Sequence, residues 1–506
     1  MGISRVLPAS SLEVFYVVPG MQSVPHVSTG VEGLDHVLGG GLPAARFHLI
    51  QGDPGSGKTT LGLQFLLEGL RRGEKGLYVT LSETGEELRA VADSHGWDLS
   101  GLPIFELASG VEYLSLGEQN TLFEPSEIEL AEVTRALLAE VERVKPVRVV
   151  FDSLSEMRLL AQSALRYRRQ LLALKQHFAE RGATVLMADD RTSETSDLQL
   201  QSLAHGVISL EQLSPLYGAE RRRLRVVKMR GVDFRGGYHD FRIERGGIRV
   251  FARLIAAEHH QPFRAEIVPS GVAELDALLG GGLDRGTSAL FIGPAGTGKS
   301  VLAAQYASAV ALRGEAASIY AFDESVHTLT ARAEALGMRV TELIASTRLR
   351  VQQIDPAEMS PGEMVDQIRE EVEARGTRVL VIDSLNGFLA AMPEEKFLIV
   401  QLHELLSYLR QRGVLTILTL AQAGMIGPMS SPVDVSFLAD TVVLLRFFEA
   451  QGEVRKAISV LKRRLGRHAM DIRELGMDAK GVHVGARLSN MQGVLTGIPR
   501  ILPGVE

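Results

Sequence analysis

The sequence of 506 residues contains no cysteine. This absence excludes disulfide bonds, thiolate zinc sites, iron–sulfur clusters and a cysteine nucleophile, and it fits a reducing compartment. No apolar run reaches the roughly 18 residues that a membrane-spanning helix needs. Pro8 and Glu13 interrupt the N-terminal stretch before the apolar core of a signal peptide can form. We therefore expect a cytoplasmic protein that does not associate with membranes.

An excess of basic charge is also lacking. The chain has 54 Lys and Arg residues against 61 Asp and Glu, a formal net charge of −7. No overall positive charge therefore attracts nucleic acid or anionic lipid. The composition, 45% hydrophobic and 23% charged, is that of a globular protein, and the length is typical of several domains.

The chain contains an internal repeat. Residues 28–42 (STGVEGLDHVLGGGL) recur as residues 269–283 (PSGVAELDALLGGGL). Three further landmarks follow in the same order in both copies: a glycine-rich segment, an aspartate after an apolar run, and a KxR sequence. Repetition of a long pattern in one order indicates a duplicated domain. We expect domains at residues 1–256 and 257–506.

Each copy alternates short apolar runs with helical segments. In the first copy, residues 47–51, 76–81, 147–151 and 183–188 are predicted strands, and residues 165–181 a predicted helix. Short, almost continuously apolar strands that alternate with helices indicate a parallel sheet covered on both faces. The predicted fold class is α/β, with two tandem P-loop domains that each contain a mainly parallel, twisted sheet with helices on both faces.

The glycine-rich segments match the P-loop pattern GxxxxGK[ST]. Its glycines let the backbone N–H groups surround a phosphate, and the following helix presents its positive end to that anion. Lys58 and Lys299 would contact the β- and γ-phosphates and assist catalysis. The expected nucleotide contacts are Gly52, Asp53, Pro54, Gly55, Ser56, Gly57, Lys58, Thr59 and Thr60, and Gly293, Pro294, Ala295, Gly296, Thr297, Gly298, Lys299, Ser300 and Val301.

Oxygen ligands for Mg²⁺ are expected next to each P-loop. Thr59 and Ser300 follow the lysines, and Asp152 and Asp383 each end an apolar run. An aspartate at a strand end can instead cap the next helix. Because a P-loop precedes the aspartate in both copies, we favour the metal role.

Hydrolysis also needs a group that orients or deprotonates water. Glu83 follows the second predicted strand of the first copy, and Asp323 and Glu324 follow the corresponding strand of the second. Carboxylates at this edge of a parallel sheet lie where ligands bind. Capping of the following helices is the alternative role.

The repeated lead-in, the P-loops, the Asp-Ser pairs and the KxR sequences resemble the KaiC family, circadian-clock ATPases of the RecA-like superfamily. The resemblance spans Ser28 to Pro499. It implies tandem RecA-like domains in a homohexamer, with ATP and Mg²⁺ bound between neighbouring subunits. By the same resemblance Lys228, Arg230, Lys462 and Arg464 would reach the γ-phosphate of the neighbour's ATP.

The family also autophosphorylates an adjacent Ser and Thr in its second domain, and these positions align with Ser436 and Phe437. The resemblance therefore implies a serine autokinase with one acceptor, Ser436. The first copy keeps one carboxylate, Glu83, where the family has an acidic pair, since residue 82 is serine.

Two other functions remain open. A DNA-stimulated RecA-like motor would use the basic run at residues 220–230. That run lacks interleaved aromatic residues, so nucleic-acid binding is less favoured. A nucleotide-gated assembly scaffold without kinase activity would fit the single carboxylate of the first copy and Phe437.

Overall fold

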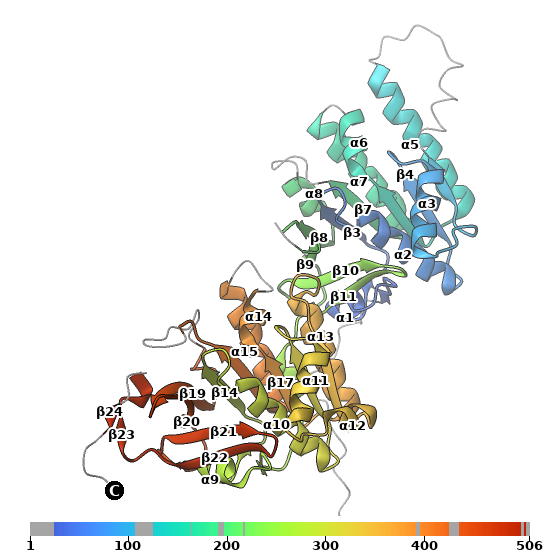
Figure 1. Ribbon diagram of the computed structural model, residues 1–506. Helices are drawn as coiled ribbons and strands as arrows, with labels where there is room; N and C mark the ends of the chain where they lie inside the picture. Colours follow the sequence, from blue (N-terminus) through green and yellow to red (C-terminus); the bar gives the residue numbers. More distant parts are fainter. Residues whose placement is uncertain are drawn as a thin grey trace, which may run out of the picture. The chain divides into compact units, whose positions relative to one another are not determined.

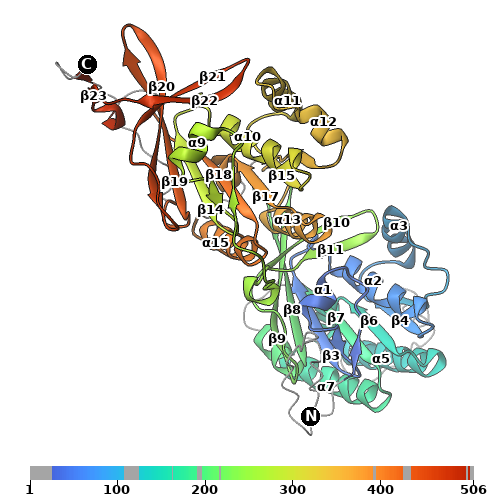
Figure 2. The same ribbon diagram turned by 90° about the horizontal axis from the view of Figure 1, so that it is seen from below.

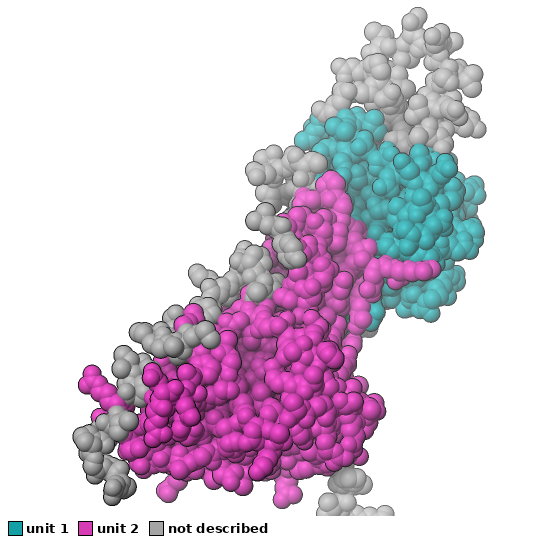
Figure 3. All heavy atoms as spheres, in the orientation of Figure 1, with its two compact units in different colours: residues 1–51, 58–208, 226–235 teal, residues 52–57, 209–225, 236–506 magenta. Residues whose placement is uncertain are grey.

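The computed structural model describes residues 25–106, 125–161, 163–190, 197–215, 218–390, 395–424, 435–496 and 500–501. Unit 1 comprises residues 1–51, 58–208 and 226–235, and unit 2 comprises residues 52–57, 209–225 and 236–506 (Figure 3). Unit 2 includes the hairpin β10 (His239–Glu244) and β11 (Gly247–Phe251). The hairpin belongs to the first copy of the sequence repeat, yet its Arg242 Nη1 pairs with Glu363 Oε1 of the second copy at 2.9 Å. The units therefore do not follow the sequence repeat, and a domain boundary after residue 256 stays a prediction.

Nine strands form the first sheet in the order β11-β10-β9-β8-β3-β7-β6-β4-β5 (Figure 1). Beyond β10 and β11 these are β3 (Phe47–Gly52), β4 (Gly76–Thr80), β5 (Ile104–Glu106), β6 (Arg148–Asp152), β7 (Thr184–Asp190), β8 (Gly206–Leu213) and β9 (Arg221–Met229). The β4–β5, β4–β6 and β6–β7 pairs are parallel, whereas β10 is antiparallel to both of its neighbours, β9 and β11.

The second sheet repeats this topology in the order β16-β15-β17-β18-β14-β19-β20-β21-β22 (Figure 2). Its strands are β14 (Ser288–Gly293), β15 (Ala317–Ala321), β16 (Leu349–Gln353), β17 (Val379–Asp383), β18 (Leu415–Ala421), β19 (Thr441–Ala450), β20 (Glu453–Arg463), β21 (Arg473–Asp478) and β22 (Gly481–Arg487). Read from the opposite edge, each strand has its counterpart in the first sheet. The strand that precedes the P-loop, β3 or β14, is the central one of the nine.

Helices connect these strands. The first copy has α1 (Leu34–Val37), α2 (Lys58–Arg71), α3 (Gly85–His95), α5 (Pro125–Val144), α6 (Leu154–Ala161), α7 (Ala164–Glu180) and α8 (Asp197–Leu203). The second has α9 (Ala273–Leu278), α10 (Lys299–Leu312), α11 (Val326–Ala335), α12 (Val340–Ala345), α13 (Pro361–Arg375), α14 (Leu385–Ala390) and α15 (Glu395–Gln411). Two-stranded pairings join β1 (His26–Val27) to β2 (Leu42–Pro43), β12 (Ile267–Val268) to β13 (Leu283–Asp284) and β23 (Met491–Gln492) to β24 (Arg500–Ile501), and 3-10 helices span Ala256–His259 and Val494–Thr496.

Apolar side chains fill both faces of the second sheet. Phe291 of β14 belongs to a cluster with the buried face of α10, whereas its neighbour Leu290 belongs to a cluster with α13 and α15. Successive residues of a strand point to opposite faces. A strand covered on both sides is therefore apolar at most positions, and this explains the nearly continuous apolar runs.

The first sheet follows the same rule. Helices α5, α6 and α7 share one apolar cluster with Leu49, Val79 and Phe151. Helix α2 packs against β4, β6 and β7. A Cβ atom at Gly62 of α2 would lie 2.9 Å from Val150 Cγ1, so this helix approaches the sheet closely. The predicted α/β architecture with helices on both faces is thus confirmed in both copies.

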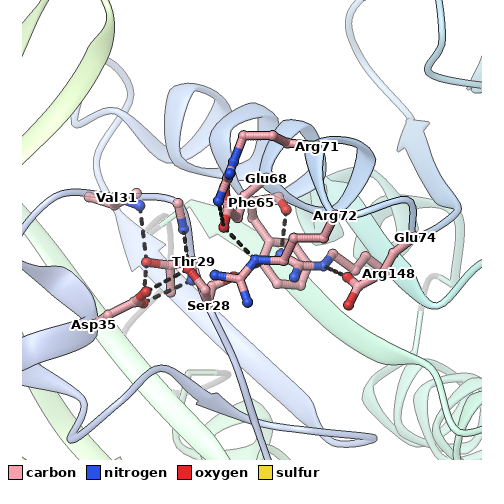
Figure 4. A network of polar contacts seen from close by, with 11 residues as sticks. Ser28, Thr29, Val31, Asp35, Phe65, Glu68, Arg71, Arg72, Glu74 and Arg148 are labelled. Carbon is pink, nitrogen blue, oxygen red and sulfur yellow. Dashed lines mark hydrogen bonds and ion pairs between the residues drawn. The ribbon is translucent and has the colours of Figure 1, made fainter.

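The repeated lead-in has a structural role (Figure 4). The carboxylate of Asp35 accepts hydrogen bonds from Ser28 Oγ at 2.6 Å, from Thr29 N at 2.8 Å and from Thr29 Oγ1 at 2.7 Å. In the second copy Asp276 Oδ1 accepts from Ser270 N at 2.7 Å. The aspartate of the LD pair therefore holds the turn that precedes α1 or α9, which accounts for part of the sequence repeat.

Arg148 anchors this lead-in to the first sheet (Figure 4). Its guanidinium is fully buried, donates to the carbonyl oxygens of Ser28 and Phe65 at 2.7 and 2.8 Å, and pairs with Glu74 at 2.5 Å. It also lies 4.8 Å from the centroid of the Phe65 ring. A buried cation needs such partners, because desolvation without them is costly.

We expect Asp35→Ala to destabilise the first copy by about 2–3 kcal/mol, because three donors lose a charged acceptor. Trp97 is the single tryptophan of the chain and lies in unit 1, so its fluorescence in urea reports this unfolding. Glu180→Ala, an exposed change in α7, is the control and should stay within about 0.5 kcal/mol of the parent. Equal unfolding midpoints for both variants would contradict this role of Asp35.

Candidate active sites

The glycine-rich loops lie between strand and helix in both copies. Strand β3 ends at Gly52 and α2 begins at Lys58, and β14 ends at Gly293 and α10 begins at Lys299. Gly298 has a φ of 106°, and a Cβ atom there would lie 2.0 Å from Met477 Cε. Gly57 has a φ of 99°. Only glycine fits such positions, which is the local reason for the identical glycine spacing in the two copies.

A hydroxyl and a carboxylate meet beside each P-loop lysine. Thr59 Oγ1 donates to Asp152 Oδ2 at 2.7 Å, and Ser300 Oγ donates to Asp383 Oδ1 at 3.0 Å. Asp152 and Asp383 are the last residues of β6 and β17, as the sequence predicts. Since their carboxylates contact the P-loop helix, this arrangement favours the metal role over helix capping.

These oxygen atoms suit Mg²⁺, which prefers hard oxygen ligands and takes several of them from phosphates and water. Among the described residues there is no group of three or more His, Cys, Asp or Glu side chains that could hold a metal. A site with one carboxylate and one hydroxyl from the protein agrees with that pattern of ligation. The donor sets of both copies therefore fit a nucleotide-bound magnesium ion.

The two P-loop lysines have different partners. Lys58 Nζ forms an ion pair with Asp190 Oδ1 at 2.7 Å, whereas Lys299 Nζ donates to the carbonyl oxygen of Pro294 at 2.7 Å. Both lysines are 7% exposed. Burial lowers the pKa of Lys299 to about 8, although the negative charges of Asp383 and Asp323 oppose this shift.

Strand register identifies Ala421 as the counterpart of Asp190 in the second copy, so the two positions differ in charge. Phe151 of β6 pairs with Met187 of β7, and Ile382 of β17 pairs with Leu418 of β18. Three residues further along, β7 ends at Asp190 and β18 ends at Ala421. The second copy thus has no carboxylate at the position that holds Lys58 in the first.

Glu83 lies beside this group in the first copy. Its backbone N–H and carbonyl both bond Thr80 Oγ1, at 3.0 and 2.6 Å, and among the described residues its buried Oε2 atom has no hydrogen-bond partner. Burial raises the pKa of Glu83, and the charges of Asp152 and Asp190 add to the shift. The next helix is capped by Thr84 instead. A carboxylate with a raised pKa can accept a proton from water.

The acidic pair of the second copy is held by neighbours. Asp323 accepts a hydrogen bond from Ser384 Oγ, and Glu324 Oε1 pairs with Arg332 Nη1 at 2.8 Å. Ser325 caps α11, so neither carboxylate has the capping role that the sequence left open.

The KxR cations lie on backbone carbonyl groups of their own chain. Lys228 Nζ donates to the carbonyl of Gln201, and Arg230 Nη2 donates to that of Ser202 at 3.0 Å. Lys462 Nζ donates to the carbonyl of Ser436 at 2.9 Å, and Arg464 Nη2 to that of Phe437 at 3.0 Å. The two copies therefore have matching contacts, and they place Ser436 beside Lys462. Ser436 is half-buried, and Phe437 is 54% exposed.

Sequence reasoning missed Asp190. Its signal was available, because Asp189 and Asp190 follow the predicted strand at residues 183–188 and so lie at the same sheet edge as the P-loop. The neighbouring Asp189 is fully buried and pairs with Arg158 of α6 at 2.8 Å. Asp189 thus forms a buried ion pair with α6, whereas Asp190 forms an ion pair with the P-loop lysine, Lys58.

A model of the KaiC ATPase family matches residues 27–255 and again residues 268–489. The chain belongs to the KaiC family. Its two sheets are accordingly tandem RecA-like domains, and membership supports ATP binding and ATPase activity.

Curated relatives match over nearly the whole KaiC-family chain. The circadian clock protein KaiC3 of Synechocystis is 29% identical over 490 residues, which cover 94% of this chain and 95% of the relative. The circadian clock oscillator protein KaiC of Synechococcus elongatus is 27% identical over 489 residues, covering 94% and 92%. Among the described residues, no helix is long and apolar enough to cross a membrane.

Exchange of Asp190 and Ala421 should exchange the nucleotide affinities of the two sites. Asp190→Ala leaves the buried Lys58 without its counter-ion, so phosphate binding becomes more favourable. We expect the Kd for ATP at the first site to fall by about 5- to 50-fold, and Ala421→Asp to raise that of the second. Lys299→Ala and Lys58→Ala backgrounds isolate each site in titrations with fluorescent ATP. Weaker binding by Asp190→Ala would refute the competition between carboxylate and phosphate.

The affinity of the second site should depend on pH. Lys299 has a pKa of about 8 and has to be charged to hold phosphate. At pH values above 8, Lys299 therefore takes up a proton when ATP binds. The Kd for ATP should increase by nearly tenfold for each pH unit above 8. Below pH 7 this group should have no effect. Calorimetry of the Lys58→Ala variant in two buffers measures the proton uptake, and a constant Kd from pH 7 to 9 would exclude it.

Proposed function

We propose that the protein is a KaiC-like ATPase that forms homohexamers with ATP between subunits, and that its second domain phosphorylates Ser436. The observation that carries this proposal is the duplicated site. In each copy the P-loop hydroxyl contacts a strand-end carboxylate, and a further acidic residue follows the neighbouring strand. The family matches at residues 27–255 and 268–489 also support a domain boundary after residue 256. A cytoplasmic location stays a prediction.

The residues of each site have separable tasks. Lys58 and Lys299 would bind the β- and γ-phosphates, and the glycine-rich loops would surround them with N–H groups. Thr59 with Asp152, and Ser300 with Asp383, would hold Mg²⁺, which offsets phosphate charge when bound. Glu83, in the first site, would orient the attacking water and accept its proton. Asp323 and Glu324 would do so in the second.

Autophosphorylation would use the same second site. The hydroxyl oxygen of Ser436 forms the new bond to the γ-phosphorus, the bond from that phosphorus to the bridging oxygen breaks, and ADP leaves. The hydroxyl proton goes to the carboxylate of Glu324. Lys462 and Arg464 donate hydrogen bonds to the carbonyl groups of Ser436 and Phe437. These contacts support the proposal that the acceptor Ser436 and the two cations approach the ATP of a neighbouring subunit as one group.

The arginines of β9 support this function over a DNA-stimulated motor. Arg223 pairs with Glu211 at 2.8 Å and lies 4.1 Å from the centroid of the Tyr238 ring. Arg225 lies 5.3 Å from the same ring. Side chains engaged in this way offer fewer cations to a phosphate backbone. The scaffold function keeps support from Phe437 and from Ser82, and a kinase assay separates it from the proposal.

Incubation with γ-labelled ATP and Mg²⁺ should label Ser436, located by mass spectrometry. Ser436→Ala and Lys299→Ala should abolish the label, whereas Lys58→Ala, which disables the first site, should retain it within a hexamer. Release of phosphate without labelled protein would show that the protein is an ATPase and would contradict the proposed kinase activity. Rings that form with ATP but release no phosphate would favour the scaffold.

Glu83→Gln in a Lys299→Ala background should lower steady-state ATP hydrolysis by about 10²–10⁴-fold, because the water loses its base. Nucleotide binding should change little. Glu86→Gln, an exposed change in α3, is the matched control and should retain the parental rate. Loss of nucleotide binding in Glu83→Gln would show a structural rather than a catalytic role.

A further inference from the structure

The acidic residues of the two sites come from different strands. In the second copy, Asp323 and Glu324 both follow β15. In the first copy, Glu83 follows β4, the preceding residue is serine, and Asp190 ends β7. The negative charge of Asp190 contributes to the raised pKa of Glu83, so these two carboxylates interact electrostatically. The first site therefore also contains two carboxylates, although they are far apart in sequence.

Strand register shows which positions correspond after β4 and β15. Leu81 N donates to the carbonyl of the aspartate that ends β6, and Phe322 N donates to that of the aspartate that ends β17. The next residues are Ser82 and Asp323, and both are exposed. The first copy thus has a hydroxyl at the place where the second copy has the first member of its acidic pair.

One carboxylate acts on the P-loop lysine in each copy. Asp190 Oδ1 pairs with Lys58 Nζ at 2.7 Å. In the second copy the charge of Asp323 acts on Lys299 and opposes the fall in its pKa. The carboxylate with this position relative to the lysine comes from the end of β7 in the first copy and from the segment after β15 in the second.

The serine that follows each strand-end aspartate is connected to the same two carboxylates. Ser384 Oγ donates directly to the carboxylate of Asp323. Ser153 Oγ forms a hydrogen bond with Ser155 Oγ, which in turn donates to Asp190 Oδ2 at 3.0 Å. Equivalent serines therefore lead to Asp323 in one copy and to Asp190 in the other.

The residue that contacts the end of β7 or β18 differs in a matching way. Ser155 and Asn386 each lie three residues after the strand-end aspartate. Asn386 Nδ2 donates to the carbonyl of Ala421 at 3.2 Å, and Ala421 N donates to Asn386 Oδ1 at 2.8 Å. Asn386 thus binds the main chain of its partner, whereas Ser155 binds the side chain of Asp190. The first copy has a donor for a carboxylate where the second copy has none to hold.

We propose that Asp190 is the second carboxylate of the first site, equivalent in role to Asp323, and that it orients the attacking water together with Glu83. The inference rests on the proposed ATPase function and adds to it a residue from another strand. When ATP binds, its phosphate becomes the partner of Lys58, and the carboxylate of Asp190 becomes available to water. A carboxylate there opposes phosphate binding but stabilises the oriented water, so Asp190 weakens ATP binding and accelerates hydrolysis.

The reaction step is balanced with these residues. The water oxygen forms a bond to the γ-phosphorus, the bond from that phosphorus to the bridging oxygen breaks, and ADP leaves. One proton of the water goes to the carboxylate of Glu83. The other O–H group donates a hydrogen bond to Asp190 during the attack and stays in the phosphate product.

Asp190→Asn tests this role, because asparagine keeps the shape of aspartate and can still accept a hydrogen bond from Ser155. In a Lys299→Ala background, we expect the single-turnover rate of ATP hydrolysis to fall by about 10- to 100-fold. The Kd for ATP should fall as well, because Lys58 loses its counter-ion. Single-turnover rates do not include the release of ADP, so tighter product binding does not affect them. A purely structural role of Asp190 would instead weaken binding and slow hydrolysis together.

Ser82→Asp is the matched rescue, because it gives the first copy the acidic pair of the second. Added to Asp190→Asn, it should restore the single-turnover rate to within about threefold of the parent. An unchanged rate in Asp190→Asn would overturn the inference and leave Asp190 as a counter-ion alone. A lost rate that Ser82→Asp does not restore would overturn the equivalence with Asp323. If the Lys299→Ala parent binds ATP but does not hydrolyse it, the proposed ATPase function of the first site is refuted instead.

Discussion

The contact between a P-loop hydroxyl and a strand-end carboxylate depends on the parallel register of the central strands, and the rest of each site is arranged around it. Strands β3, β7, β6 and β4 are neighbours in the first sheet, so side chains just after their C-terminal ends share one edge. Thr59, Asp152 and Glu83 come from three separate segments and meet there. A shift of register by one residue would turn Asp152 to the opposite face of the sheet.

The two copies of the domain share one sheet topology but carry different charges. In the first copy, Lys58 of the P-loop has a carboxylate partner, and the KxR cations donate to carbonyl groups of residues 201 and 202. In the second copy, the P-loop lysine donates to a neutral carbonyl, and the KxR arginine Arg464 also pairs with the carboxylate of Asp440. Backbone geometry is shared, whereas electrostatics are not. Two domains with one topology can in this way bind the same nucleotide under different conditions.

Much of the fold could be predicted because its signals are local. Strands β3, β6 and β7 are mostly apolar, and the glycines of both P-loops stand at fixed spacing, so these strands, the loops and the ends of β6 and β17 were predicted from the residues alone. The capping of α3 by Thr84 instead of Glu83 was not, since both residues can cap. The contact between Lys58 and Asp190 depends on which strands become neighbours. Sequence spacing carries little information on such pairs, 132 residues apart in the case of Lys58 and Asp190.

The difference between Asp190 and Ala421 also has a genetic aspect. Aspartate and alanine codons can differ in their second base alone, so a single point mutation converts one residue into the other. Both positions are the last residue of a strand in the same sheet topology, and neither change disturbs a turn or an apolar layer. After duplication of an ancestral domain, the counter-ion of a P-loop lysine could therefore be gained or lost in one step while the fold stayed intact.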